Sequence, residues 1–271
     1  MGAKKEKPVA SSSRSVFAAG LAAGCALAVG LYGGGAPPPG SPGARLLSAV
    51  SPTPVMTLHY FDIRGRGEAI RLALHDQGVV FDERPITNDE WARDRTDGLK
   101  QRMIDAGRLP FGQLPMLDAG AAGDIVQSHA ILRFLGRTHG WYGGTPAALA
   151  AVDAAAEGTE DVRKRLLEKK EDPEARAIYF ADGGEARLWL GHYDALISRS
   201  PTPFVGRSPS PTHADYLLFD LLDTHEAWDP ERTAAILGEL PALASWRKGM
   251  ARRPGIAMYL ASTARRPYKT T

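Results

Sequence analysis

Apolar and polar residues alternate with two different periods between residues 57 and 138. A period of two, typical of a half-buried strand, marks Thr57–Phe61, and a period near that of an α-helix marks a helix that ends at Gly78. A second strand is predicted at Val79–Phe81, and the polar stretch Asn88–Leu109 is typical of an irregular helical excursion. This part of the chain therefore begins as strand, helix, strand.

The stretch Phe111–Gly136 predicts two short strands joined by a hairpin and then a helix. The strands are expected at Met116–Asp118 and Ile125–Val126, and the apolar face of the helix begins just after Ser128. The order βαβ followed by ββα implies one mixed sheet with helices packed on it, which is an α+β arrangement.

Pro115 and Ser128 give this stretch its candidate chemistry. A peptide bond before proline can be cis at modest cost, and a cis bond here would turn the backbone of Leu114 outward, where it could pair with an extended peptide. Ser128 lies at a helix N-terminus, where free N–H groups and the helix dipole favour a carboxylate. Together they suit a short acidic peptide. The alternative is that Ser128 is a plain N-cap and Pro115 a plain turn residue.

After about residue 145 the pattern predicts helices only. The predicted helices are Ala147–Lys170, Glu174–Arg199, Tyr216–Glu226, Pro230–Leu237 and Pro241–Arg252. Asp172-Pro173 separates the first two, and Thr212 and Asp215 have the spacing of a capping box that opens the third. We therefore divide the body into a mixed domain at residues 55–143 and an all-helical domain at residues 145–268.

Residues 1–54 differ in composition from the rest. Basic residues near the start precede an apolar run, Val16–Tyr32, and a Pro/Gly/Ser-rich tract follows it. The first part is typical of a signal peptide or signal anchor, with a candidate cleavage site at 26–28, and the acid-poor tract is typical of organellar transit segments. We expect a targeting leader for an organellar or secretory route. A weak membrane anchor, or a disordered tail on a cytoplasmic protein, is the alternative, and membrane contact is expected only through this run, if it is retained.

Charge and composition exclude several functional classes for the body. The net charge is +2, but residues 1–55 carry five basic side chains and one acid, so the body has a net charge of about −2, is near neutral and has no nucleic-acid footprint. The single cysteine, Cys25, lies in the apolar run, which leaves the body without a disulfide or a cysteine nucleophile. The seven histidines have no metal-ligand spacing, so no metal site is predicted.

Several stretches, in this order and spacing, resemble the cytosolic glutathione S-transferases, closest to the pi class with likeness to the sigma class. They are HYFDIRGRGEAIRL, Leu99-Lys100, FGQLP, QSHAILRFLGRTHGWYG, AAVDAAAEGTEDVRKR and THADYLLFDLLDTHE. The resemblance runs from about Thr57 to the C-terminus. It implies a thioredoxin-like glutathione-binding domain followed by an all-helical domain.

The resemblance makes Tyr60 the catalytic tyrosine. A free thiol has a pKa of about 8.5, so little thiolate exists at neutral pH. A phenol O–H that donates to the sulfur stabilises the thiolate, which is the nucleophile. The alternative for Tyr60 is a buried strand aromatic.

The resemblance also assigns the glutathione-binding positions. They are Arg66, Trp91, Lys100, Gln113, Leu114, Pro115, Gln127 and Ser128. Arg66 and Lys100 are expected to meet carboxylate charge, and the alternative for both is a solvated surface charge. Phe61 and Ile63 are candidates for the apolar floor of the electrophile pocket.

Asp161 matches the family acid that reaches the glutathione amino group in the neighbouring subunit, which implies a homodimer. The alternative is an acid on a helix surface that pairs with Arg165 one turn later. The chain departs from the pi pattern by extra residues between Lys100 and Phe111, and by Glu171 where that pattern has a pocket tyrosine. The second substrate is therefore expected to differ.

These expectations describe a homodimeric glutathione transferase, an enzyme of detoxification and glutathione metabolism. The thiolate of glutathione, which is a substrate, would attack an electrophilic apolar compound, with no metal involved. A glutathione-dependent isomerase of sigma type, and a non-catalytic ligand carrier or structural protein on the same fold, are the alternatives. The presence of Tyr60, Gln127 and Ser128 together favours the enzyme.

A protein that begins at Val55 should fold and bind glutathione as well as the full chain does. The composition changes at this point, and no patterned core precedes Thr57. Solubility, circular dichroism and calorimetric titration with glutathione, each beside the full chain, measure this. An insoluble or non-binding product would show that residues 1–54 belong to the fold.

Overall fold

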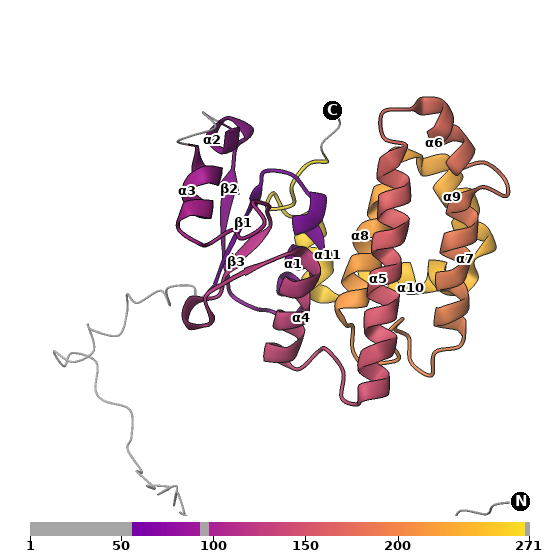
Figure 1. Cartoon of the computed structure of the whole chain (residues 1–271). Coiled ribbons are helices and arrows are strands. Elements are labelled where there is room, and N and C mark those ends of the chain that lie inside the picture. Colours follow the sequence, from indigo (N-terminus) through magenta and orange to yellow (C-terminus); the bar gives the residue numbers. More distant parts are fainter. Residues whose placement is uncertain (1–55, 93–97, 269–271) are drawn as a thin grey trace, which may run out of the picture. The chain divides into compact units, whose positions relative to one another are not determined.

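The computed structural model describes residues 56–92 and 98–268, all of which belong to one unit of the chain, Pro52–Thr271. A part built around a sheet is followed by a part built of helices (Figure 1). The leader predicted at residues 1–54 lies outside the described residues. Within residues 56–92 and 98–268, no helix is long and apolar enough to cross a membrane.

Four strands form one mixed sheet. They are β1 (Thr57–Phe61), β2 (Asp82–Ile86), β3 (Met116–Asp118) and β4 (Asp124–Val126). The order across the sheet is β2-β1-β3-β4, in which β1 and β2 are parallel while β3 is antiparallel to both β1 and β4. The α+β arrangement predicted from the sequence is confirmed.

The strand predicted at Val79–Phe81 is wrong, and the true strand follows it. Val80 is 67% exposed, and the N–H of Val79 closes the end of the preceding helix by donating to the Leu74 carbonyl at 2.9 Å. The strand that pairs with β1 is the polar segment Asp82–Ile86, which contains Pro85. Because β2 is an edge strand of the sheet, it tolerates a proline and exposed polar side chains.

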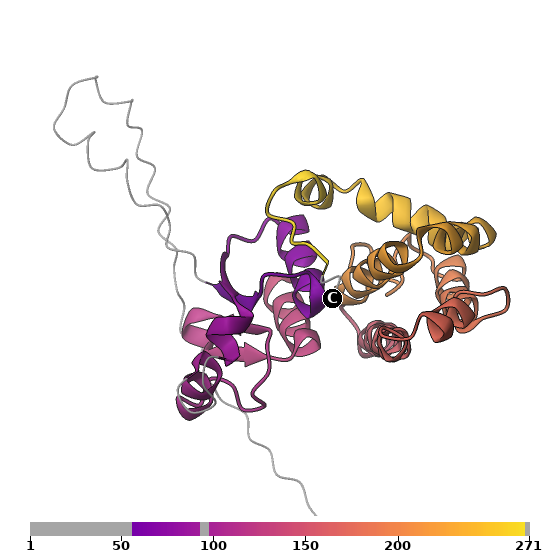
Figure 2. The ribbon, with the colours of Figure 1, turned by 90° about the horizontal axis from the view of Figure 1, so that it is seen from above.

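Helices lie on both sides of the sheet. Towards the helical part lie α1 (Glu68–Asp76) and α4 (Ser128–His139), and on the other side lie the short helices α2 (Asn88–Ala92) and α3 (Leu99–Asp105) (Figures 1 and 2). The irregular helical excursion predicted for this region corresponds to α2 and α3. A 3-10 turn, Gly65–Gly67, joins β1 to α1.

Seven helices follow among the residues described after 144. They are α5 (Pro146–Glu168), α6 (Pro173–Tyr179), α7 (Glu185–Ser198), α8 (His213–Trp228), α9 (Pro230–Glu239), α10 (Pro241–Ala251) and α11 (Pro254–Ala261). The helix predicted at Glu174–Arg199 is two helices, α6 and α7. The break falls at Gly183, whose φ is +74°, and Gly184, where a Cβ would lie 2.6 Å from the carbonyl oxygens of Ile178 and Tyr179. The sequence did not predict α11.

The central helix α8 begins with the predicted capping box. The N–H of Thr212 donates to Asp215 Oδ2 at 2.9 Å, and the Thr212 side chain donates to the same oxygen. Asp215 Oδ1 also accepts from the Val205 N–H and from Trp246 Nε1, each at 3.0 Å. One buried carboxylate therefore fixes the start of α8 to a loop and to α10.

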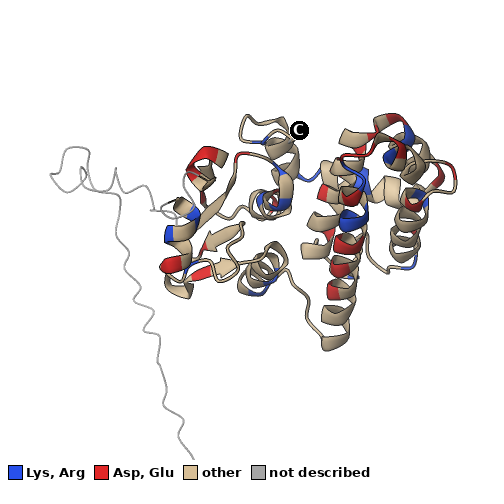
Figure 3. Ribbon diagram, turned by 45° about the horizontal axis from the view of Figure 1, so that its top comes forward, with Lys and Arg blue, Asp and Glu red and all other residues tan. Residues whose placement is uncertain are grey.

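Polar contacts at the two ends of α1 join the two parts of this unit. Tyr216 on α8 donates to Asp76 at 2.7 Å, and Arg253 before α11 pairs with the same carboxylate at 2.7 Å. Tyr259 on α11 donates to the buried Glu68 at 2.9 Å. In the view of Figure 3, acidic and basic residues are interspersed, and α5 carries both signs towards its C-terminal end.

Replacing Asp215 should destabilise the protein more than replacing an ordinary helix cap. We expect Asp215→Ala to lower the free energy of unfolding by about 3 kcal/mol or more, since several buried donors lose a charged acceptor at once. Asp229→Ala is the matched control, because Asp229 caps the exposed start of α9 through a bond of 3.0 Å to the Arg232 N–H and meets the exposed Arg232 guanidinium at 3.2 Å. That change should cost about 1 kcal/mol. Urea unfolding of both variants measures the difference, and equal losses would mean that Asp215 acts only as a cap.

Candidate functional site

A cavity of about 400 Å³ opens where the end of β1, the loop before β3, the start of α4 and the middle of α5 meet. It is lined by Phe61, Arg66, Trp91, Gly112, Gln113, Leu114, Pro115, Gln127, Ser128 and Glu160. The structure therefore brings most of the predicted site residues to one place, although they come from separate parts of the chain.

Tyr60 lies directly behind the wall formed by Phe61 and Arg66, with 7% of its surface exposed. Its hydroxyl oxygen accepts the backbone N–H of Arg66 at 2.8 Å. A Cβ on Gly65 would lie 2.5 Å from this oxygen, and one on Gly67 would lie 2.6 Å from the ring, so both positions require glycine. Burial raises the pKa of Tyr60, and the Arg66 N–H lowers it by less. The hydroxyl therefore keeps its proton at neutral pH and can donate it.

Ser128 is the first residue of α4, and the position before it, Gln127, is the N-cap. The interpretation of Ser128 as a plain N-cap is therefore wrong. Gln127 has a φ of +72°, which non-glycine residues seldom adopt, and its carbonyl accepts the Ile131 N–H at 2.9 Å. The N–H groups at the start of α4 precede this first helical bond, and the buried Ser128 lines the cavity beside them.

The opposite wall comes from the segment before β3. The Leu114–Pro115 bond is cis, the form that the sequence analysis considered, and both residues are buried. Gln113 is exposed, and its side-chain oxygen accepts from Gln127 Nε2 at 3.4 Å. These two glutamines join the two walls.

Arg66 meets carboxylate charge within its own chain. Its guanidinium donates to both oxygens of Glu160 on α5, at 2.8 and 2.6 Å. Although burial alone would raise it, the Arg66 guanidinium holds the pKa of Glu160 below its usual value. Sequence reasoning missed Glu160, because it assigned the acid of the Glu160-Asp161 pair to Asp161.

Besides Tyr60, three predicted site residues are outside the lining of the cavity. Lys100 is exposed, with its ammonium 5.8 Å from the Trp91 ring and its Cε 3.2 Å from where a Cβ on Gly112 would lie. Ile63 is partly buried in the apolar cluster around Tyr60. Asp161 is exposed on α5.

The alternative pairing of Asp161 is also not formed. Arg165, one turn later on α5, donates instead to Glu185 on α7 at 3.3 Å. The carboxylate of Asp161 therefore stays on the helix surface, outside the lining of its own cavity.

The arrangement suits a short extended peptide with carboxylates. Helix N–H groups and the Ser128 hydroxyl offer hydrogen-bond donors to an anion, Arg66 lines the same cavity, and Lys100 lies near its Trp91 and Gly112. Phe61 and Trp91 pack edge to face at 5.5 Å and supply an apolar surface. Within the described part of the chain, no group of three His, Cys, Asp or Glu residues could hold a metal ion.

Two family models match the chain in order. The N-terminal domain of glutathione S-transferase matches residues 56–137, and the C-terminal domain of glutathione S-transferase matches residues 161–263.

Whole-chain comparisons agree with these models. The chain is 32% identical to glutathione S-transferase P 1 of Bufo bufo over 221 residues, which cover 78% of this chain and 94% of that protein. It is 34% identical to glutathione S-transferase P of Caenorhabditis elegans over 211 residues, or 76% and 91% of the two chains. The solved pi-class glutathione S-transferase of Onchocerca volvulus superposes with a TM-score of 0.65 at 28% identity, over 76% of this chain and 92% of that one. Because these relatives are matched over nearly their whole length and both domain models fit in order, the chain belongs to the glutathione S-transferase family.

Proposed function

We propose that this protein binds glutathione in the cavity and activates its thiol for attack on an electrophilic apolar compound. The observation that supports this most directly is the Tyr60 hydroxyl, which keeps its proton and accepts the Arg66 N–H at 2.8 Å beside the cavity wall. Because the backbone N–H occupies one side of the oxygen, the O–H proton is left for another acceptor. A thiolate in the cavity is the acceptor that the chemistry of the family requires.

Glutathione has two carboxylates, and cationic or N–H groups lie at two separate places in or beside the cavity. We assign one carboxylate to Ser128 and the first N–H groups of α4, and the other to the side of Lys100 and Trp91. The backbone of Leu114 would pair with the middle of the tripeptide, in the manner of an added strand. This orientation directs the central thiol towards the end of β1, where Tyr60 lies.

A homodimer is part of this proposal. Asp161 lies on the outer surface of α5 and outside its own cavity, whereas its neighbour Glu160 faces Arg66. In a dimer, an acid in that place would serve a ligand held by the other subunit. Phe61 and Ile63, next to Tyr60 in sequence, would provide the apolar floor for the electrophile.

Ser128→Ala should raise the Michaelis constant for glutathione by about ten- to a hundredfold while leaving the fold intact. One lost hydrogen bond to a carboxylate is worth about 1.5–3 kcal/mol. Thr145→Ala is the matched control, since Thr145 also presents a hydroxyl at a helix start, where it accepts the Ala148 N–H at 3.2 Å, but lies outside the cavity lining. Steady-state kinetics and thermal melts of both variants measure this. Unchanged glutathione affinity with a lowered melting temperature would make Ser128 a structural residue only.

Tyr60→Phe should leave glutathione affinity nearly unchanged and lower turnover at neutral pH by about ten- to a hundredfold. The ring keeps its packing, and only the O–H that stabilises the thiolate is removed, so the bound thiol pKa should rise by about one to two units. Tyr193→Phe is the control, because its buried hydroxyl donates to the Ala155 carbonyl at 2.9 Å and not to the site.

The measurement is conjugation rate against pH, with glutathione affinity determined separately. Coincident pH profiles for wild type and Tyr60→Phe would make Tyr60 a packing residue. Glutathione binding without conjugation of any electrophile by either protein would favour the ligand carrier, and turnover of an isomerisation substrate alone would favour the isomerase.

A further inference from the structure

The last described residues of the chain, 262–268, return from α11 to the loop between β1 and α1. We call residues 262–268 the C-terminal strap and residues 61–67 the tyrosine loop. The N–H of Arg64 in the loop donates to the Pro267 carbonyl at 3.0 Å, and Arg64 Nε donates to the Arg266 carbonyl at 2.8 Å. The guanidinium of Arg64 also lies 4.2 Å from the centre of the Tyr268 ring. The strap therefore binds the loop through backbone and side-chain groups.

Arg266 adds charge to this contact. Its guanidinium pairs with Asp62 in the loop at 2.9 Å and with Glu83 on β2 at 3.2 Å. Asp62 is largely exposed while Arg266 is mostly covered, so the pair lies at the edge of the contact. One side chain of the strap thereby ties the loop to the sheet.

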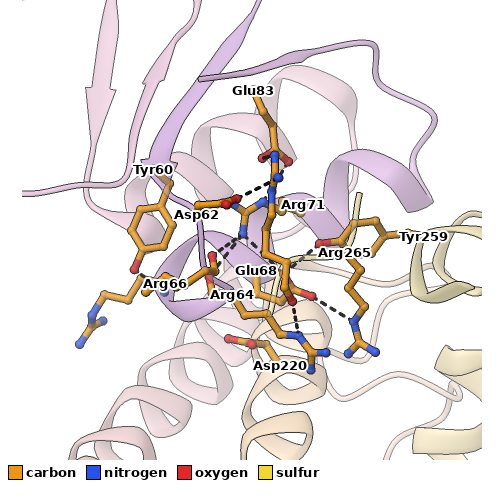
Figure 4. A network of polar contacts seen from close by, with 12 residues as sticks. Tyr60, Asp62, Arg64, Arg66, Glu68, Arg71, Glu83, Asp220, Tyr259 and Arg265 are labelled. Atoms are coloured by element: carbon orange, nitrogen blue, oxygen red, sulfur yellow. Dashed lines mark hydrogen bonds and ion pairs between the residues drawn. The ribbon is translucent and has the colours of Figure 1, made fainter. Parts of the chain in front are cut away.

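The other side of the loop is held by α1. Arg71, which is 1% exposed, donates to the Ile63 carbonyl at 2.9 Å and pairs with Glu83 at 2.9 Å (Figure 4). Glu83 therefore accepts from an arginine on each side of the loop. The loop is clamped between a buried guanidinium and the strap.

The tyrosine loop packs so closely against Tyr60 that it has little room to move. Its Arg66 N–H is the group that bonds the Tyr60 hydroxyl, and its Gly65 and Gly67 lie directly against the Tyr60 ring. Phe61 and Arg66 of the same loop line the cavity. A small movement of this loop would therefore change the donor geometry at Tyr60 while leaving in place the walls at Ser128 and Leu114, which belong to other elements.

We propose that the C-terminal strap is a positioning element for thiol activation, and that Arg266 is its key side chain. This proposal rests on the proposed function, because it acts through Tyr60. Arg266 and Pro267 hold the tyrosine loop so that the Arg66 N–H points at the Tyr60 hydroxyl, whose remaining proton then faces the thiol. The charged groups close to Tyr60 include Arg66, which bonds its hydroxyl, and Arg71, which lies 5.8 Å from its ring. Arg266 pairs with Asp62 and Glu83 instead, so it works through the position of the loop.

The neighbouring arginine of the strap has a different role. Arg265 pairs with the buried Asp223 and lies 3.5 Å from the buried Glu68. Its loss would leave buried carboxylates with fewer cations, so it anchors the strap to the fold. Of these two adjacent arginines, Arg265 therefore contributes to stability, and Arg266 positions the loop.

The test compares Arg266→Gln with Arg187→Gln in the full chain. Arg187 is the matched control, because its side chain is 40% exposed and pairs with Glu239 at 2.6 Å, a contact between α7 and α9 that does not involve the strap or the tyrosine loop. For Arg266→Gln we expect kcat at neutral pH to fall by about three- to tenfold and the bound thiol pKa to rise by about half to one unit. The Michaelis constant for glutathione should change less than twofold, and wild-type kcat should return at high pH. Arg187→Gln should match wild type throughout.

A purely structural role predicts another pattern. An Arg266→Gln profile that coincides with wild type, or that falls equally at every pH along with the melting temperature, overturns the proposal. Arg266→Lys should recover part of the shift, because a lysine can reach one of the two carboxylates but cannot bridge both.

Hydrogen–deuterium exchange of residues 61–67 separates this proposal from the proposed function. We expect faster exchange in Arg266→Gln than in wild type or Arg187→Gln, whether or not an electrophile is conjugated. If wild type fails to conjugate, the proposed function fails while exchange still reports on the strap. If exchange is unchanged, the strap does not hold the loop and the proposal fails while conjugation stands.

Discussion

The rest of the site depends on the interactions of the buried Arg71 guanidinium. It lies inside the sheet-bearing part, between Glu68 at 3.6 Å and Glu83 at 2.9 Å, and it holds the loop carbonyl of Ile63. Removing one partner of such a buried pair typically costs about 3–5 kcal/mol, because a charge is left without compensation. The loop that carries Arg66 is therefore fixed by the core and not by its own local preference.

Glu68 extends this network to the end of the chain. It is fully buried and accepts from Tyr259 on α11 at 2.9 Å. Burial, followed by the nearby Asp220, raises the pKa of Glu68 to about 7, while Arg71, Tyr259 and Arg265 oppose that rise. Because contacts over nearly 200 residues of sequence meet at one carboxylate, the position of α1 and the docking of α11 depend on each other.

The fold could be predicted from the sequence more fully than the site could. Periods of two and of about 3.6 located β1, β3, α1, α4 and α5, because those elements bury one face. The same reasoning failed at β2, an edge strand whose contribution is backbone pairing with β1 and not apolar area. It failed again at Gly183-Gly184, since two glycines near a helical pattern can be tolerated or can end a helix, and only the close approach to Ile178 and Tyr179 decides between these outcomes.

Glu160 and Asp161 show that sequence reasoning can also fail in the choice between two neighbouring residues. Neighbouring positions on a helix point about 100° apart, and the sequence does not state which faces the cavity until α5 is packed against the tyrosine loop. Once packed, Arg66 has two attachments: its side chain to Glu160 on α5, and its backbone N–H to Tyr60 at the end of β1. A helix of one part of the fold is thereby joined to the hydroxyl of the other through a single residue. Sequence motifs can name Tyr60 and Arg66, but the precision of their contact comes from elements far away in the chain.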